Sequence, residues 1–536
     1  MSKIVRLIIT SFISRKILIF KKGSVWNLLE IPLLTEGNIE LFFHNYCKSK
    51  HSVYINFILN PSKYSYSETI NNTTYIYYWA FTCTEQNSTS CDSKWINFDK
   101  LVLSENTRQY ISEHIHSSIY AYSGTTERTP SLNDVAIQTS KQAFSRVAPL
   151  RIIYPEITFI NPPNIIDRYY LDKVIHHSIE SPNEFIIDSD TLNSWGIIGM
   201  LPLLLYKHKK VIIESKIQGC NIGSRPISIY LYVMKLFGVS VQLESEKTIL
   251  EYRPTDLYSN IEICIPVAGS FTATSIAIYF AIIRSGTTRI KQCSIEPEIL
   301  FLLDTIRLLG YTVIQNECEF TIYGRCVHDA VNVSIPIDRN VIVTRMISSI
   351  REKKAFYYSN ANNLYLERFA SLLQSIGVKI SYKENEITIP SDQDIIDKQT
   401  IIVYNHYPQL CTDWHPLIST LLLNNKYETV QFDTVFEGRF YYLEQFKRIY
   451  PALNIQVSDQ LAIFHNTAPS CIKNTLDMHA FNLADIRSAA ALLITLQNCN
   501  DYQLYNILQL FRGYESAYQI SNKIGGNLSY GFDERV

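Results

Sequence analysis

The sequence is short of glycine and of net charge, and each shortage excludes something. Only 18 of the 536 residues are Gly, about half the usual share, so a glycine-rich phosphate loop is not expected. The 49 Lys and Arg residues are balanced by 50 Asp and Glu residues, a net charge of −1. This balance argues against a protein that binds nucleic acid or an anionic membrane through its overall charge.

Paired cysteines and long apolar runs are also missing. The 11 cysteines include no C-x-x-C pair and no Cys/His cluster at zinc spacing, which predicts reduced thiols and no metal site. Arg6, Arg15 and Lys16 interrupt the apolar start of the chain, and no run reaches the ~18 residues of a membrane span. We therefore expect a cytoplasmic protein with no cofactor and no membrane partner.

The sequence contains enough hydrophobic residues to form large cores. Hydrophobic residues make up 46% of the chain, with 36 Tyr and 25 Phe. No basic stripe accompanies the aromatic runs, so we expect these residues in the core, not as stacking platforms for nucleic acid bases. A chain of this length predicts about three or four domains.

A repeated pattern fills most of the chain. An apolar helical segment that stops at a small residue and leads into a β-rich run recurs roughly every 70 residues. The stops are Gly238, Gly310, Gly377, Ala452 and Gly525. Glycine in this position suits the left-handed conformation that ends a helix.

A second helix precedes each of these segments. Its expected starts lie near Asn193, Thr272, Thr344, Asp413 and Asp485, all residue types that suit or tolerate an N-cap. Together the two patterns predict an α/β fold of six repeated units between residues ~135 and ~530, although chance α/β alternation would also give such a pattern. Residues 1–120 do not follow it and predict a separate α+β domain of unknown function.

Reactive side chains cluster at the expected helix starts. Helix N-termini attract phosphate groups, so converging starts with added Lys and Arg would form an anion site without a glycine loop. The candidate residues are Lys141, Cys220, Arg225, Asp413, Arg439, Asp485, Arg487 and Arg512.

Five short segments, taken in order, resemble the enolpyruvyl transferases. They are GCNIGSRP at 219–226, TD at 412–413, TVFEGRF at 434–440, DIRSAAAL at 485–492 and RGYE at 512–515. The resemblance is strongest to the branch that uses UDP-N-acetylglucosamine in peptidoglycan synthesis. It implies an inside-out α/β barrel of two domains with three repeats each, at 141–340 and 341–536. A linker and strand at 121–140 would join the C-terminal domain.

The resemblance also implies a reaction and its participants. The enolpyruvyl group of phosphoenolpyruvate would pass through a tetrahedral intermediate to a hydroxyl of a nucleotide sugar, with release of phosphate. Cys220 would be the general acid and the target of fosfomycin, and Asp413 would be the base. Lys141, Arg225 and Arg512 would contact phosphoenolpyruvate, and Arg439 would be a further active-site arginine. The expected sugar-nucleotide contacts are Gln142, Arg225, Pro226, Ile227, Ser228, Ile229, Ser270, Phe271 and Val435.

Three departures from the family pattern concern the acceptor. Gln142 stands where the family has Asn, Ser228 replaces an acidic residue, and an arginine expected around Leu192–Asn193 is absent. Two alternatives therefore stay open, a related transferase with another acceptor and a non-catalytic paralogue that binds ligands. We expect a monomer, although the sequence does not determine the oligomeric state.

Each candidate also has a purely structural interpretation. Cys220 would then be a buried apolar residue, Lys141 a surface lysine, and Asp413 and Asp485 simple N-caps. Arg439 and Arg487 would form ion pairs with Glu437 and Asp485, which for Arg487 is the favoured interpretation. His415, two residues after Asp413, has no third partner for a metal site and is expected to be structural.

Overall fold

The structure is a computed structural model of the chain, and it describes part of the residues. Before residue 137 the described residues are those of strands β1 to β9. After it they are 137–180, 185–187, 194–213, 227–244, 247–254, 259–324, 330–383, 385–393, 399–423, 425, 427–450, 452–465, 475–482, 485–497, 500–505 and 508–515. Residues 137–338 are called the first half below, and residues 339–515 the second half.

The first half alternates helices with short strands. Its helices are α4 (Lys141–Val147), η4 (Ala148–Ile152), α5 (Ile166–Glu180), α6 (Ser194–His208), α7 (Ser228–Leu236), α8 (Phe271–Ile283) and α9 (Pro297–Leu308). Its strands are β10 (Thr158–Ile160), β11 (Phe185–Ile187), β12 (Lys210–Ile213), β13 (Val239–Leu243), β14 (Thr248–Tyr252), β15 (Ile261–Cys264), β16 (Thr287–Lys291), β17 (Thr312–Asn316), β18 (Glu319–Tyr323) and β19 (Asn332–Ser334).

The second half continues the alternation. Its helices are α10 (Arg339–Arg351), α11 (Glu367–Ser375), η5 (Thr412–Trp414), α12 (His415–Leu422), η6 (Arg439–Tyr441), α13 (Tyr442–Ile449), α14 (Ile486–Thr495) and α15 (Leu508–Phe511). Its strands are β20 (Phe356–Ser359), β21 (Ser381–Lys383), β22 (Glu386–Ile389), β23 (Thr400–Asn405), β24 (Leu410–Cys411), β25 (Thr429–Asp433), β26 (Asn454–Val457), β27 (Leu461–His465), β28 (Thr475–Asn482) and β29 (Asn500–Tyr505).

One sheet topology recurs in both halves. The strand orders β11-β12-β14-β13 and β15-β16-β18-β17 are equivalent, and β23-β25-β27-β26 repeats them. In each, the first two strands run parallel across a helix, and the last two form an antiparallel hairpin after the second helix. Parallel neighbours need a crossover helix, whereas antiparallel neighbours need only a short turn. The repeated sequence pattern therefore corresponds to a repeated α/β unit.

Glycine ends the second helix of these units as the pattern predicts. Gly238, Gly310 and Gly377 have φ values of 89°, 89° and 88°, in the left-handed region that L side chains avoid. They follow α7, α9 and α11 and turn the chain into a hairpin strand. Ala452 lies in the loop after α13 instead, and Gly525 is outside the described residues.

Four of the five predicted starts of the other helix agree with the structure to within two residues, since α6, α8, α12 and α14 begin at Ser194, Phe271, His415 and Ile486. Asp485 caps α14, because its carboxylate accepts hydrogen bonds from two backbone amides. The prediction for Thr344 was wrong, since α10 begins at Arg339 with Asp338 as its cap, and Thr344 is buried inside that helix. Ser270 occupies the N-cap of α8, just before the predicted Thr272. Asn193 lies outside the described residues.

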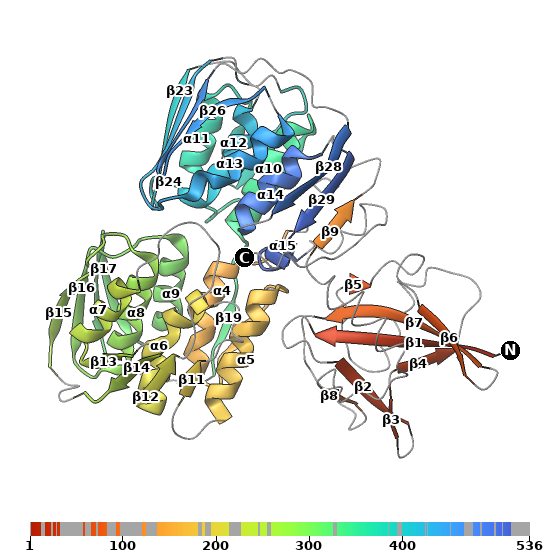
Figure 1. Cartoon of the computed structure of the whole chain (residues 1–536). Helices are drawn as coiled ribbons and strands as arrows, with labels where there is room; N and C mark the ends of the chain where they lie inside the picture. The colour runs from red at the N-terminus through yellow and green to blue at the C-terminus, as the bar shows by residue number, and fades with distance from the viewer. Residues whose placement is uncertain are drawn as a thin grey trace.

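Two apolar cores divide the repeat region. One draws its buried residues from positions 144–335, and α8 is buried along most of its length there. The other draws them from positions 341–514 and adds Ile166 and Tyr170 of α5. Figure 1 shows the corresponding two α/β bodies, green to yellow and cyan to blue. α5 thus packs into both cores.

The chain passes between the two halves at paired segments. Thr139 and Ile337 form an antiparallel bridge, and the backbone amide of Ser140 donates to the carbonyl of Pro336 at 2.7 Å. Strand β9 (Ala121–Gly124) pairs with β29 of the second half, although it precedes the first half in the sequence. The first half is therefore inserted between β9 and the rest of the second half.

The strands before residue 97 form a separate sheet (Figure 1). They are β1 (Ser2–Ser11), β2 (Ile17–Lys22), β3 (Val25–Asn27), β4 (Leu29–Pro32), β5 (Phe57–Ile58), β6 (Tyr66–Ile70), β7 (Thr73–Thr82) and β8 (Ser93–Ile96). β1 runs parallel to β7 along its full length. Only strands are described here, so the α+β class of this domain stays a prediction.

In the described part of the chain, every helix is too short or too polar to cross a membrane.

We expect Gly238→Ala to lower the free energy of unfolding by about 1 kcal/mol, because the backbone there is left-handed. An added Cβ would meet nothing within 4 Å, so the strain is confined to the backbone. Gly324→Ala should be more damaging, because its Cβ would lie 1.7 Å from the carbonyl oxygen of Arg284. Urea unfolding of both variants measures the difference. Equal losses would contradict this interpretation.

Candidate active site between the two halves

A cavity of about 360 Å³ lies between the two halves and is lined by side chains from both. The first half contributes α4, the start of α5, and residues of α6, α7 and α8. The second half contributes the segments around η5, η6, the start of α14, and the end of α15. The charged and polar lining residues are Lys141, Gln142, Ser145, Arg146, Asp167, Arg168, Tyr230, Ser270, Thr272, His406, Asp413, Arg439, Asp485, Arg487 and Arg512.

One carboxylate joins cations from opposite ends of the repeat region. Asp167, near the start of α5, forms an ion pair with Lys141, the first residue of α4. It also accepts from the Nε of Arg512 at 2.9 Å and from its Nη2 at 3.4 Å. Asp167 is buried, and the two cations lie 371 positions apart in the chain. The carboxylate therefore fixes both of them at the cavity wall.

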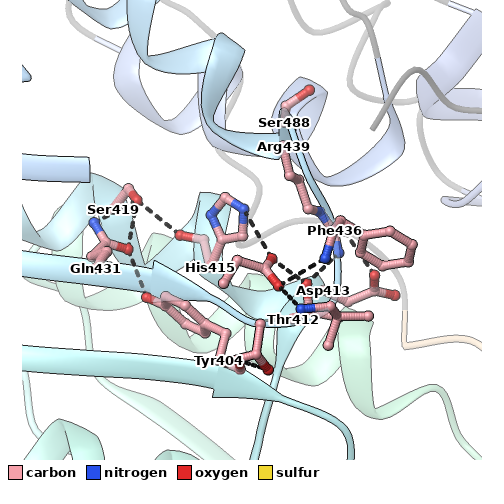
Figure 2. Close-up of polar contacts among 12 residues, drawn as sticks. Tyr404, Thr412, Asp413, His415, Ser419, Gln431, Phe436, Arg439 and Ser488 are labelled. Atoms are coloured by element: carbon pink, nitrogen blue, oxygen red, sulfur yellow. Dashed lines mark hydrogen bonds and ion pairs between the residues drawn. The ribbon is translucent and has the colours of Figure 1, made fainter. Parts of the chain in front are cut away.

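A second carboxylate lines the cavity from the second half. Asp413 Oδ1 accepts from Arg439 Nη2 at 2.8 Å, and its Oδ2 accepts from the amide of Gln142 at 3.1 Å. Its side chain keeps 21% of its surface exposed. Figure 2 shows the Arg439 side chain directed at Asp413. This carboxylate is thus oriented by one group from each half and remains accessible from the cavity.

The Arg439 side chain is itself held by a polar relay. Its Nη1 donates to Thr412 Oγ1 at 2.8 Å, and that hydroxyl donates to Asp433 Oδ2 at 2.5 Å (Figure 2). Asp433 Oδ1 accepts from the backbone amides of Val435 and Phe436. The end of strand β25 therefore anchors the loop that carries Val435 to the cavity.

Burial shifts the pKa values of these groups. Burial alone would raise the pKa of Asp167, but Arg512 and Lys141 outweigh it and hold that pKa below its usual range. Burial acts to lower the pKa of Arg439, yet Asp413, Asp485 and Asp433 raise it above its ordinary value. Both groups therefore stay charged in the cleft near neutral pH.

Among the described residues, neither ion pair of the structural interpretation is formed. Arg439 pairs with Asp413, not with Glu437. Arg487 donates to the hydroxyl of Tyr514 at 2.9 Å, while the Asp485 carboxylate accepts from the backbone amides of Arg487 and Ser488. A carboxylate that caps a helix has its oxygens directed at the backbone, so it is less available to the neighbouring side chain.

His415 is a structural residue, as expected. It is fully buried, and its Nδ1 lies 3.0 Å from the hydroxyl of Tyr442. Burial and the charge of Arg439 lower its pKa well below the ordinary value. Within the described residues, there is no group of three or more His, Cys, Asp or Glu that could hold a metal ion.

Most of the predicted site residues that are described lie at this cavity. Those that line it are Lys141, Gln142, Ile229, Ser270, Phe271, Asp413, Val435, Arg439, Asp485, Arg487 and Arg512. Ile227 and Ser228 do not line it, since Ile227 packs against the first core and Ser228 is exposed. Cys220, Arg225 and Pro226 are outside the described residues. So is the position near Leu192–Asn193 where an arginine was expected.

Asp167 was missed by the sequence analysis. It stands in the first turn of a helix, where an acidic residue is common for reasons of the helix dipole. Only the fold places it against Lys141 and Arg512. Arg146 was also missed, although it is four residues after Gln142 in the same helix and so lies on the same face.

Helix starts surround the cavity, but they are not equivalent. The starts of α4 and α14 are capped by side chains, Ser140 and Asp485 respectively. At α8 the N-cap Ser270 makes no side-chain capping bond, and no acidic residue stands in the first turn. Of these three starts, α8 is the one suited to receive an anion.

The arrangement suits anionic substrates and proton transfer. Lys141, Arg439, Arg487 and Arg512 supply positive charge, and Asp413 is a partly exposed carboxylate next to one of them. Such a carboxylate can accept a proton from a hydroxyl group bound nearby. The cations can stabilise phosphate or carboxylate groups and the charge that develops on them.

Comparison with known proteins identifies relatives over more than half of the chain. The model of the family described as EPSP synthase (3-phosphoshikimate 1-carboxyvinyltransferase) matches residues 193–494. The UDP-N-acetylglucosamine 1-carboxyvinyltransferase of Wolbachia pipientis is 25% identical over 314 residues, 58% of this chain and 70% of that protein. The enzyme of that name from Thermotoga maritima is 25% identical over 314 residues, 58% and 72% of the two chains.

Solved structures show the same fold. The enolpyruvyl transferase NikO from Streptomyces tendae superposes with a TM-score of 0.60 at 17% identity, covering 77% of this chain and 98% of its own. EPSP synthase from Acinetobacter baumannii gives 0.54 at 12% identity, covering 76% and 99%. The α/β fold is therefore that of these transferases, while the barrel form and the number of repeats stay predictions.

We expect Asp167→Asn to destabilise the protein by about 3 kcal/mol at pH 7, because two cations would lose a buried partner. The folded pKa of Asp167 is below its unfolded value of about 3.9. Its stabilisation is therefore complete above about pH 5 and is lost as pH falls through the folded pKa. The Asp167→Asn variant should not show this loss of stability as the pH falls.

Urea unfolding at several pH values from 7 down to 3 measures this difference. Asp172→Asn is the matched control, because its carboxylate pairs with Arg168 in a partly exposed i,i+4 pair, worth less than about 1 kcal/mol. Equal pH dependence in the wild type and in Asp167→Asn would contradict the assignment.

Proposed function

Because the chain belongs to the EPSP synthase family of enolpyruvyl (carboxyvinyl) transferases, we propose that it transfers the enolpyruvyl group of phosphoenolpyruvate to UDP-N-acetylglucosamine or a related nucleotide sugar. The products are the enolpyruvyl ether of the acceptor and free phosphate. One observation carries this proposal, the convergence of Lys141, Asp413, Arg439 and Arg512 on one cavity between the halves. A reaction between two anionic substrates needs this combination of several cations and one accessible base.

Asp413 is the proposed base for the acceptor hydroxyl. Its carboxylate is held from two sides, by Arg439 and Gln142, with part of its surface facing the cavity. The proton of the hydroxyl passes to the carboxylate as the oxygen forms a bond to C2 of phosphoenolpyruvate. Cys220, the proposed acid, protonates the C3 methylene, which gives the tetrahedral intermediate. Loss of a C3 proton and of phosphate then restores the double bond.

Lys141 and Arg512 are the proposed contacts to phosphoenolpyruvate, together with Arg225. Asp167 binds both described cations and so determines their distance from each other. Pre-positioned charges of this kind need no rearrangement when negative charge develops. Arg439 supports Asp413 and adds positive charge to the same wall.

The second part of the proposal concerns the identity of the acceptor. Two relatives with 25% identity are named for UDP-N-acetylglucosamine, which supports a nucleotide sugar and a place in cell-wall precursor synthesis. The open start of α8 at Ser270 and Phe271 supports a phosphate-bearing acceptor. Gln142 in place of Asn contacts Asp413 directly, so the departure lies next to the acceptor hydroxyl. A related transferase with another acceptor is the alternative that this residue favours.

The direct test is phosphate release from phosphoenolpyruvate with a panel of acceptors. We expect release with UDP-N-acetylglucosamine or another UDP-sugar, loss of it in Cys220→Ala, and inhibition by fosfomycin. If Cys220→Ala releases phosphate as fast as the wild type, the assignment of Cys220 as the acid is wrong. No release with any acceptor, and no phosphoenolpyruvate adduct in the intact mass, would indicate a non-catalytic paralogue.

We expect Asp413→Asn to lower kcat by about 10²- to 10⁴-fold, because general-base catalysis contributes that much. Steady-state kinetics of phosphate release measures it. Asp459→Asn, an exposed carboxylate of the same half outside the cavity, should leave kcat unchanged. A similar kcat in Asp413→Asn and the wild type would rule out the base assignment.

A further inference from the structure

His406 is a cavity-lining residue of the second half that no step above uses. It stands directly after β23, and its side chain is half-buried at the cavity wall. Among the described residues, the two ring nitrogens have no hydrogen-bond partner, and only the backbone of His406 is bonded. The imidazole is therefore available to a ligand in the cavity.

The turn that carries His406 is fixed by both halves. The backbone amide of His406 donates to Asn405 Oδ1 at 2.7 Å, and its carbonyl accepts from the backbone amide of Gln409 at 3.0 Å. The next backbone amide, that of Tyr407, donates to Glu296 Oε1 of the first half at 2.9 Å. The position of the imidazole is thus determined before any ligand binds.

The imidazole packs on the loop that leads into α8 of the first half. A Cβ added to Gly269 would lie 3.3 Å from Cδ2 of His406 and 3.5 Å from its Cγ. Gly269 has a φ of 76° and directly precedes Ser270, the N-cap of α8. His406 therefore lies against the segment that carries Ser270 and Phe271, two of the expected acceptor contacts.

The strand pairing places His406 beside the proposed base. β23 and β24 run parallel, with Asn405 opposite Cys411, and neighbouring strands lie about 4.8 Å apart. His406 follows Asn405 by one residue, and Asp413 follows Cys411 by two. Both side chains line the same cavity. A sugar hydroxyl that gives its proton to Asp413 would therefore bring its ring close to His406.

The charge state of His406 indicates what kind of group it binds. Burial lowers the pKa of His406, although the charges of Glu296 and Asp433 act to raise it. The imidazole is therefore neutral near pH 7, with one nitrogen that donates and one that accepts. A phosphate group is bound best by charged donors, whereas a neutral imidazole suits a hydroxyl or an amide.

We propose that His406 hydrogen-bonds an uncharged hydroxyl or amide group on the sugar ring of the acceptor and so helps to select that ring. This inference rests on the proposed function for the identity of the acceptor, but binding of a UDP-sugar can be measured without turnover. The nucleoside part of the acceptor is the other source of uncharged hydroxyl and amide groups, and the test separates the two.

The test compares His406→Phe with the wild type in binding of UDP-N-acetylglucosamine, UDP and phosphoenolpyruvate, measured by calorimetry. Phenylalanine keeps a flat ring next to Gly269 but removes both ring nitrogens. We expect the affinity for UDP-N-acetylglucosamine to fall roughly three- to tenfold, as for loss of one hydrogen bond. UDP and phosphoenolpyruvate should bind as they do to the wild type. His406→Gln, which again offers a donor and an acceptor, should recover part of the affinity.

A second histidine of the same half provides the matched control. His465 is also half-buried, but its Nδ1 lies 3.1 Å from Glu428 Oε2, outside the cavity. His465→Phe should leave the affinity for UDP-N-acetylglucosamine unchanged. His406→Phe should melt at the same temperature as the wild type, because the ring contact with Gly269 remains.

Three results would overturn the proposal. One is binding of UDP-N-acetylglucosamine that is absent in the wild type or unchanged in His406→Phe. Another is an equal loss of affinity for UDP, which would assign His406 to the nucleotide. The third is weaker binding of all three ligands with a lower melting temperature, which would make His406 structural. If phosphate release fails while binding of UDP-N-acetylglucosamine still depends on His406, the proposed function fails and the sugar contact stands.

Discussion

The site depends on keeping several cations charged and directed into the cleft between the two halves. Buried charge is tolerated only with a fixed counter-charge and further hydrogen bonds. Asp167 supplies it to Lys141 and Arg512, and Asp413 supplies it to Arg439. Each pairing also limits how far the cation can move. The carboxylates therefore determine the geometry of the cleft as much as its charge.

One of these pairings joins parts of the chain that are distant in sequence, because Asp167 and Arg512 lie 345 positions apart. Gln138 near the start of the first half bonds the carbonyl of Gly513 and the amide of Glu515 at the end of the second. The insertion of the first half between β9 and the remaining second half brings these segments together. α4 is consequently supported by both halves, and Lys141, Gln142 and Arg146 on it face the cavity. The site is a property of the assembled pair of halves.

The scarcity of glycine has a consistent physical explanation in this fold. Gly238, Gly310 and Gly377 end helices in the left-handed conformation. Few other residues adopt this conformation without strain. Among the described residues, arginines and the uncapped start of α8 line the cavity, and no glycine-rich loop does. A phosphate-binding site thus needs no high glycine content when helix ends and guanidinium groups converge.

The sequence by itself determined the α/β class, the repeating unit, the helix stops and the family, because these depend on local periodicity and on ordered motifs. It also named Lys141, Asp413, Arg439 and Arg512, which lie at one cavity. It did not identify Asp167 or Arg146, and its favoured interpretation paired Arg487 with Asp485, which caps α14 instead. Partner choice depends on which segments the fold brings together, and local patterns carry no information about that arrangement. Only the tertiary structure decided which of these cations are paired with a carboxylate, because the pairs form between segments that the fold brings together.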